Sequence, residues 1–171
     1  MASTTVTRRS RALTDQLVVL PTRGEAGKAV MCVLDHAHEG HELDIRDAVV
    51  LTQSSSEVRV IGPSAGWPGR QRLGRRWWRA LAAALEDVAA SPPEGTCDRG
   101  WRSLVDAGMS KSFLQEAATA LATSSTTLLL FAERIDVRAL LAKLEQGEFA
   151  RIIYGSLPYA AVDELATAGH P

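Results

Sequence analysis

Two strand-like runs separated by a short polar stretch constrain the fold of this chain more than any other feature of its sequence. Residues 45–52 (IRDAVVLT) and 57–61 (EVRVI) are rich in β-branched residues, and the polar residues 53–56 (QSSS) lie between them. A connection this short joins antiparallel neighbours, whereas parallel strands need a crossover of about a dozen residues or more. The sequence therefore predicts a β-hairpin inside the domain.

Three further strand-like runs and five helix-like segments surround this hairpin. We expect strands at residues 16–20 (QLVVL), 126–132 (TTLLLFA) and 149–154 (FARIIY). Helical spacing of apolar residues, or richness in helix formers, predicts helices at 25–38, 75–90, 110–121, 137–144 and 159–168. Ser110 and Asp136 are the expected N-caps of the third and fourth of these helices. Residues 62–74, which concentrate glycine and proline, and residues 94–102 are predicted as loops.

The order of these elements indicates the fold class. It reads βαββ, an inserted helix, then αβαβα, and it contains the split βαββαβ arrangement typical of ferredoxin-like sheets. We therefore expect an α+β fold, a ferredoxin-like βαββαβ sandwich with an inserted helix and an additional C-terminal helix. A doubly wound parallel sheet is the main alternative, and the hairpin argues against it.

The same pattern divides the chain into a tail and one domain. Residues 1–14 are small, polar and basic without apolar periodicity, so we predict a disordered basic tail. Residues 15–169 are predicted to form a single α+β domain, in which residues 62–102 are an inserted loop and helix.

Composition limits the environment and the partners. The chain of 171 residues has 19 Lys and Arg against 20 Asp and Glu, a net charge of -1, so no global field attracts it to nucleic acid or anionic lipid. Its apolar runs are shorter than the roughly 18 residues that a spanning helix needs. Cys32 and Cys97, far apart in a chain without a secretory segment, indicate free thiols in a reducing compartment. We expect a cytoplasmic location, no nucleic-acid partner and no membrane-spanning helix.

Three stretches of the chain resemble one bacterial family. Residues 47–53 (DAVVLTQ), 106–121 (DAGMSKSFLQEAATAL) and 124–156, with their closing strand and YGSL, are similar to the domain-of-unknown-function family twelve-sixty-nine, which is described as predicted membrane or stress-related proteins. The order of elements agrees along residues 16–168. The family typically carries a glycine-rich apolar hairpin where residues 62–102 are cationic and then alanine-rich. The resemblance implies a stress-related role and assigns no catalytic residue.

Potential chemical groups form no pattern that predicts catalysis, a metal or a cofactor. The densest group of possible zinc ligands is Cys32, His36, His38 and His41. Cys32 falls on the apolar stripe of its helix, and His38 and His41 lie near a helix end where histidine favours the dipole, so we expect no metal site. Residues 54–56 lie in a predicted turn without a GxSxG motif. Neither GxxxxGK[ST] nor GxGxxG occurs, so we expect no nucleotide cofactor.

The remaining feature is a concentration of five arginines and three tryptophans within residues 67–79, which we name the Arg/Trp segment. Such residues anchor protein interfaces, lie at lipid surfaces or stack on bases. Alternatively, one tryptophan packs in the core and the arginines are solvated. Trp78 shares a helical stripe with Leu81, so we expect Trp78 to be buried and Trp77 exposed. The predicted partner-binding residues are Trp67, Arg70, Arg72, Arg75, Arg76, Trp77 and Arg79.

Three classes of function follow from these features. The favoured hypothesis is a non-catalytic regulatory or assembly protein that binds another protein, or itself, through its sheet and the Arg/Trp segment. A homodimer is expected, because an open sheet with one uncovered face would expose apolar surface. The alternatives are a peripheral membrane-associated stress protein and a small enzyme with a pocket between paired sheets.

Overall fold

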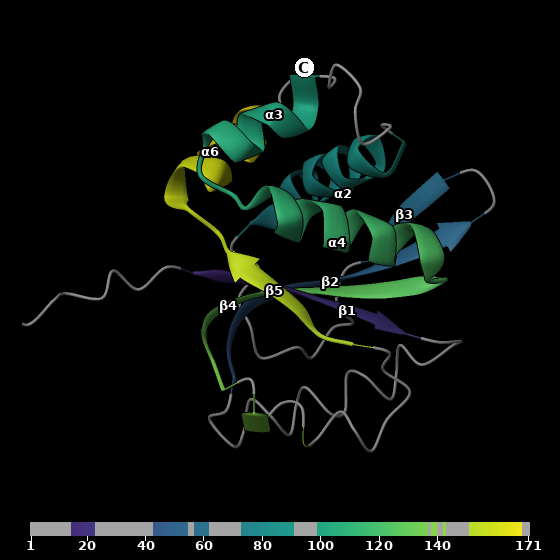
Figure 1. The fold of residues 1–171 in the computed structure, drawn as a ribbon, viewed down its shortest axis with the longest axis vertical. Helices are drawn as coiled ribbons and strands as arrows, with labels where there is room; N and C mark the ends of the chain where they lie inside the picture. Colours follow the sequence, from purple (N-terminus) through teal and green to yellow (C-terminus); the bar gives the residue numbers. More distant parts are fainter. Residues whose placement is uncertain are drawn as a thin grey trace, which may run out of the picture.

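The structure, a computed structural model, describes residues 15–22, 43–54, 57–61, 73–90, 99–136, 138–139, 142 and 151–168 (Figure 1). Within them lie five strands of one sheet and four helices, which confirms the α+β class. The strands are β1 (Gln16–Thr22), β2 (Leu43–Ser54), β3 (Glu57–Ile61), β4 (Thr126–Ile135) and β5 (Ile153–Ser156). The helices are α2 (Gly74–Ala90), α3 (Arg99–Asp106), α4 (Lys111–Thr123) and α6 (Tyr159–Ala168).

The sheet is antiparallel throughout its described strands. Their order is β3-β2-β4-β1-β5, and each of the four neighbouring pairs is antiparallel. The predicted hairpin is confirmed, since β2 pairs with β3 and Ser54 lies opposite Glu57. The residues left to make the turn, 55–56, lie outside the described ones. A doubly wound sheet would need parallel central strands, so this alternative is wrong.

The register of the pairing between β2 and β4 is irregular just before Asp47. The register shifts on both sides of Ile45, so that Arg46 of β2 and Glu133 of β4 have no residue directly opposite, and their side chains form an ion pair. Bulges bend a strand and re-aim the side chains that follow. Asp47 comes next, opposite Phe131, which belongs to the apolar cluster packed against the helices.

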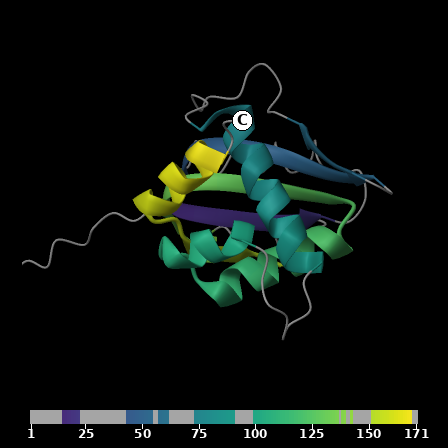
Figure 2. The same cartoon turned by 90° about the horizontal axis from the view of Figure 1, so that it is seen from above.

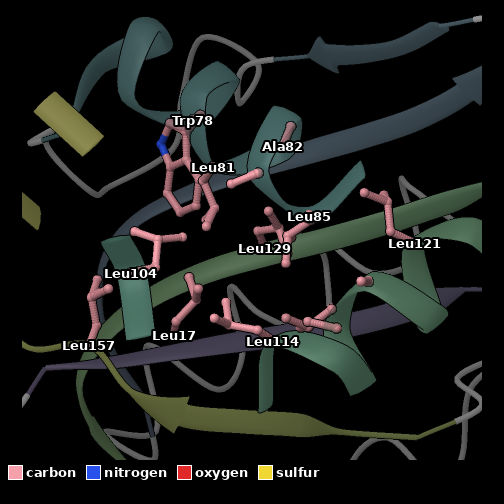
Figure 3. Packing of buried hydrophobic residues seen from close by; sticks show 14 of the residues in the cluster. Leu17, Trp78, Leu81, Ala82, Leu85, Leu104, Leu114, Leu121, Leu129 and Leu157 are labelled. Atoms are coloured by element: carbon pink, nitrogen blue, oxygen red, sulfur yellow. The ribbon is translucent and has the colours of Figure 1, made fainter. Parts of the chain in front are cut away.

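The helices lie on one face of the sheet and build the main core with it (Figures 1 and 2). Their inward stripes meet the facing residues of the central strands, and each fully buried leucine contributes about 1.5–3 kcal/mol relative to an exposed one. Figure 3 shows this cluster, in which α2, α4 and the strands contribute Leu81, Leu85, Leu114, Leu121, Leu17 and Leu129.

The opposite face of the central strands is buried as well. Successive side chains of a strand point to opposite faces. Residues 17–20 of β1 are all 0% exposed, and residues 128–130 of β4 are at most 1% exposed. The expectation that one face of the sheet lies uncovered is therefore wrong for these strands. The homodimer was expected because apolar side chains of the sheet would be exposed. For these strands that reason does not hold, so the homodimer stays a prediction without this support.

Helix α3 corrects the prediction of a loop at residues 94–102, because residues 99–102 are its first turn. Trp101 and Leu104 are buried on its inner side. Gly108, with φ of 100°, ends the helix in a left-handed conformation. The N–H of Gly108 reaches the carbonyl of Val105, and the N–H of Met109 reaches that of Leu104, both at 2.9 Å. The sequence carried a signal for this helix, because the apolar residues 101, 104 and 105 stand at helical spacing and Gly108 follows them. The polar and glycine-containing residues before them indicated a loop instead.

The remaining expected elements divide into three groups. The N-cap at Ser110 is confirmed, because its Oγ accepts the N–H of Phe113 at 3.4 Å. Asp136 likewise accepts the N–H groups of residues 138 and 139 at 3.1 Å. The last strand is displaced, since β5 spans Ile153–Ser156 rather than 149–154. The tail 1–14 and the predicted helix 25–38 lie outside the described residues, as does most of 137–144.

Candidate functional site

The start of α2 divides the Arg/Trp segment into an inner and an outer side. Gly74 begins the helix with φ of 75°, a conformation that L side chains rarely adopt. Trp77 and Trp78 are each 3% exposed, whereas Arg75, Arg76 and Arg79 are exposed. The helix therefore presents three arginines outward and both tryptophans inward. We name these three residues the arginine surface.

Asp47 holds the inner side in place. It is 1% exposed, and its carboxylate accepts three N–H groups. Oδ2 accepts the backbone N–H of Leu73 at 3.0 Å and the indole N–H of Trp78 at 3.2 Å, while Oδ1 accepts the N–H of Ala48 at 2.9 Å. A buried carboxylate satisfied by several donors is a strong anchor. Strand β2 thereby fixes the residue before α2 and the first turn of the helix.

Asp47 is the important residue that the sequence analysis missed. The sequence carried a signal, because Asp47 directly precedes the apolar run Ala48–Leu51 in a predicted strand. Charged residues are almost never fully buried without partners. Its partners stand 26 and 31 positions away along the chain, so spacing could not identify them.

The predicted exposure of Trp77 is wrong. Its indole N–H donates to the carbonyl of Val162 in α6 at 3.1 Å. Its ring meets that of Trp78 edge to face, with 4.9 Å between the centroids and 89° between the planes. The helical stripe predicted which side of α2 faces the sheet. It could not predict that α6, 85 positions away, covers the neighbouring side.

The three arginines are unfavourable for the helix that carries them. The N-terminal end of a helix is positive and prefers carboxylates, yet the first turn of α2 has no acidic residue. Arg75 and Arg79 stand four positions apart and Arg76 and Arg79 three, so their like charges also repel. Among the described residues, no carboxylate forms an ion pair with any of the three. The concentration of charge therefore does not serve the stability of α2.

Other predicted site residues are not placed. Trp67, Arg70 and Arg72 lie outside the described residues. Cys32, His36, His38 and His41, for which we expect no metal site, also lie outside the described residues. Where the structure describes side chains, no three His, Cys, Asp or Glu residues are grouped in a way that could hold a metal ion.

Open hollows lie beside the helical layer, and described residues line two of them. One, of about 240 Å³, lies between the first turn of α4 and strand β5 and is lined by Ser110, Ser112, Phe113, Glu116 and residues 152–155. The other, of about 290 Å³, lies between α2, α4 and the hairpin and is lined by Gln53, Val58, Glu86, Ala89, Ala90, Ala118, Leu121 and Ala122. In the first, the hydroxyls of Ser110 and Ser112 lie 2.8 Å apart, and Ser110 caps α4. Neither lining brings a serine and a histidine together.

Comparisons with known proteins return no relative. No family model matches the chain, and no curated protein and no solved structure matches it. Over the part of the chain that the structure covers, no helix has both the length and the apolar character to cross a membrane.

Proposed function

We propose that this chain is a non-catalytic regulatory or assembly protein that binds another protein through the arginine surface at the start of α2. The observation that carries the proposal is the outward position of Arg75, Arg76 and Arg79 near a helix end whose first turn has no acidic residue. Arginine is enriched at the centres of protein interfaces, where its planar guanidinium binds carboxylates through two hydrogen bonds. An acidic partner would relieve the repulsion among the three charges.

The rigid support beneath these residues favours a recognition role. Asp47 fixes the first turn of α2 to the sheet, and Trp78 packs beneath it in the core. A preorganised surface loses less side-chain and backbone entropy when a partner binds. The arginine surface thus presents exposed charges on a backbone that Asp47 and Trp78 hold in place.

Two alternatives have less support. A peripheral membrane protein would need aromatic residues at the surface beside its cations. Of the Arg/Trp segment, the structure describes Trp77 and Trp78, and both are turned inward. A small enzyme would need a nucleophile activated by a base. In the first hollow the hydroxyl of Ser110 caps α4, and neither of the two described linings brings a serine and a histidine together. Binding therefore remains the favoured class.

We also propose that the sheet has a ferredoxin-like topology. Strand β4 lies between β1 and β2, and β1 lies between β4 and β5, an order that supports the split arrangement of that class with β3 added at the edge. From the order of the elements in the sequence we also propose a relation to the family twelve-sixty-nine and a stress-related role, although no family model matches the chain. Both crossover segments, 23–42 and 136–152, fall largely outside the described residues.

Affinity capture from the native cell, followed by mass spectrometry, tests the proposed function. The bait is the full chain, in wild-type form and with the three arginines of the arginine surface replaced by glutamine. The control bait carries Arg102→Gln, Arg138→Gln and Arg151→Gln, which remove three other exposed charges. We expect one stoichiometric partner with the wild-type and control baits and its loss from the first triple variant. Equal recovery by all three baits would exclude the arginine surface as the binding site.

Light scattering on the purified chain distinguishes a foreign partner from a second copy. A mass near 18.4 kDa across the micromolar range excludes self-association. A mass near twice that value, which returns to the monomer's in the triple arginine variant, assigns the arginine surface to self-association.

A further inference from the structure

Helix α6 covers the side of α2 that carries Trp77. The carbonyl of Val162 accepts the indole N–H of Trp77, and Ala161 and Leu165 are 0% and 3% exposed in the shared core. Figure 2 shows α6 beside α2 when the molecule is seen from above. The Trp77 ring, adjacent to the arginine surface in the sequence, is thus hidden by a segment from the end of the chain.

Helix α6 buries only one narrow side against the domain. The helix has ten residues, and isolated helices shorter than about 12–15 residues are marginal in water. Apart from Ala161, Leu165 and the half-buried Val162, its residues 159–167 are exposed. It follows β5, a four-residue strand at the edge of the sheet. Elements with few buried contacts open locally while the rest of a domain stays folded.

The helix also has the chemistry of a ligand for this surface. Two exposed carboxylates, Asp163 and Glu164, directly follow the residue that accepts the Trp77 N–H. Its buried side chains are small or aliphatic. A short acidic helix with one narrow apolar side therefore already lies against Trp77, on the helix that carries the exposed arginines.

We propose that α6 is an exchangeable intramolecular ligand, and that a partner carrying a short acidic amphipathic helix displaces it from Trp77. The partner helix would take the indole N–H on one of its polar atoms, pack its apolar side on the exposed ring and place its carboxylates toward Arg75, Arg76 and Arg79. This inference rests on the proposed function and adds the chemistry of the partner and the regulation of the site. A tethered segment competes at an effective concentration in the millimolar range, so α6 would keep weak partners away.

Hydrogen exchange on the wild-type chain tests the opening of α6 without any partner. We expect the amides of 159–168 to exchange roughly 100-fold faster than those of α4, because opening of α6 leaves the sheet and α4 intact. The variant Trp77→Phe keeps an aromatic ring but lacks the donor to Val162, and it should raise exchange in α6 by a further ~5-fold or more. Exchange of α6 at the rate of α4 in both proteins would overturn the proposal.

Binding of a peptide tests the exchange itself. The probe is a fluorescein-labelled peptide with the sequence of residues 157–168 (LPYAAVDELATA). Ala161→Asp places a charge in the buried side of α6, whereas Ala160→Asp makes the same change at its exposed neighbour. We expect at least ~10-fold tighter binding to the Ala161→Asp chain than to the wild type or to Ala160→Asp.

The outcomes separate this inference from the proposed function. Equal peptide binding by the three chains would overturn the exchange, whatever partner capture shows. If Ala161→Asp unfolds the domain, the exchange rates of the wild-type and Trp77→Phe chains decide alone. Rapid exchange in α6 with unchanged partner capture by the triple arginine variant would contradict the proposed function and leave the opening of α6 intact.

Discussion

The carboxylate of Asp47 accepts the indole N–H of Trp78 at 3.2 Å, and this bond joins the bulged part of β2 to the first turn of α2. Trp78 lies in the core, at the upper left of Figure 3, with its nitrogen at the edge of the apolar cluster. Because Trp78 is held inward, Arg75, Arg76 and Arg79 are directed outward. One buried hydrogen bond therefore helps to orient the proposed binding surface.

Replacement of Asp47 tests this anchor. In Asp47→Ala, the N–H groups of Trp78 and Leu73 lose their acceptor inside the protein, and unsatisfied buried donors cost about 1–3 kcal/mol each. We expect the free energy of unfolding, measured by urea denaturation, to fall by roughly 2–5 kcal/mol. Asp44→Ala, on the same strand but with a side chain 43% exposed, should change it by less than about 1 kcal/mol. A loss no larger for Asp47 than for Asp44 would show that the anchor is unimportant.

Truncation of either tryptophan of α2 should destabilise the protein. Both rings are 3% exposed and contact one another, so Trp77→Ala and Trp78→Ala should each lower the free energy of unfolding by about 3–5 kcal/mol. Arg76 directly precedes Trp77 in α2 but is exposed, so Arg76→Ala should change the free energy of unfolding by less than about 0.5 kcal/mol. Thermal unfolding of the three variants measures the difference. A nearly neutral Trp77→Ala would mean that α6 does not cover the ring in solution.

Gly155 of β5 marks a close approach between the edge strand and α4. A Cβ added there would lie 2.6 Å from Cγ of the Phe113 ring, which is nearer than real Cβ atoms approach. We expect Gly155→Ala to cost about 1–3 kcal/mol, because overpacking forces the ring or the strand to move. Phe113→Leu should suppress much of this cost, so that the two changes are strongly non-additive in a double-mutant cycle. Additive losses would place the strain elsewhere.

The local features of the fold could be predicted from the sequence. The QSSS turn between two β-branched runs indicated the antiparallel hairpin, and Ser110 before an apolar periodicity indicated the start of α4. Both signals act within a few residues, where backbone geometry and hydrogen bonding decide the structure. The class of the fold followed from the order of such local elements.

The features that could not be predicted all depend on distant contacts. Periodicity placed Trp78 on the inner stripe of α2, but the burial of Trp77 comes from α6, whose Val162 is 85 positions away. The role of Asp47 likewise depends on a register shift between β2 and β4 that no spacing encodes. The short α3 was missed because a charged and glycine-containing turn opens it, although packing of Trp101 and Leu104 stabilises it. Tertiary burial overrode local propensity in each case.

Removal of the three exposed arginines should not weaken the fold. Glutamine at positions 75, 76 and 79 keeps helix propensity and removes positive charge from the positive end of α2. We expect the free energy of unfolding to stay within about 0.5 kcal/mol of the wild type or to rise slightly, with the larger effect at low salt. Circular dichroism during urea denaturation gives this value. A loss above about 2 kcal/mol would assign the arginines a structural role instead.

Calorimetric titration of the captured partner into the purified chain tests the central claim, that the arginine surface binds while the tryptophans beneath it support the fold. The account predicts that the triple Arg75→Gln, Arg76→Gln, Arg79→Gln variant, folded as stably as the wild type, binds at least ~10-fold more weakly. The control variant with glutamine at positions 102, 138 and 151 should keep the wild-type Kd. An unchanged Kd for the first variant would contradict the account.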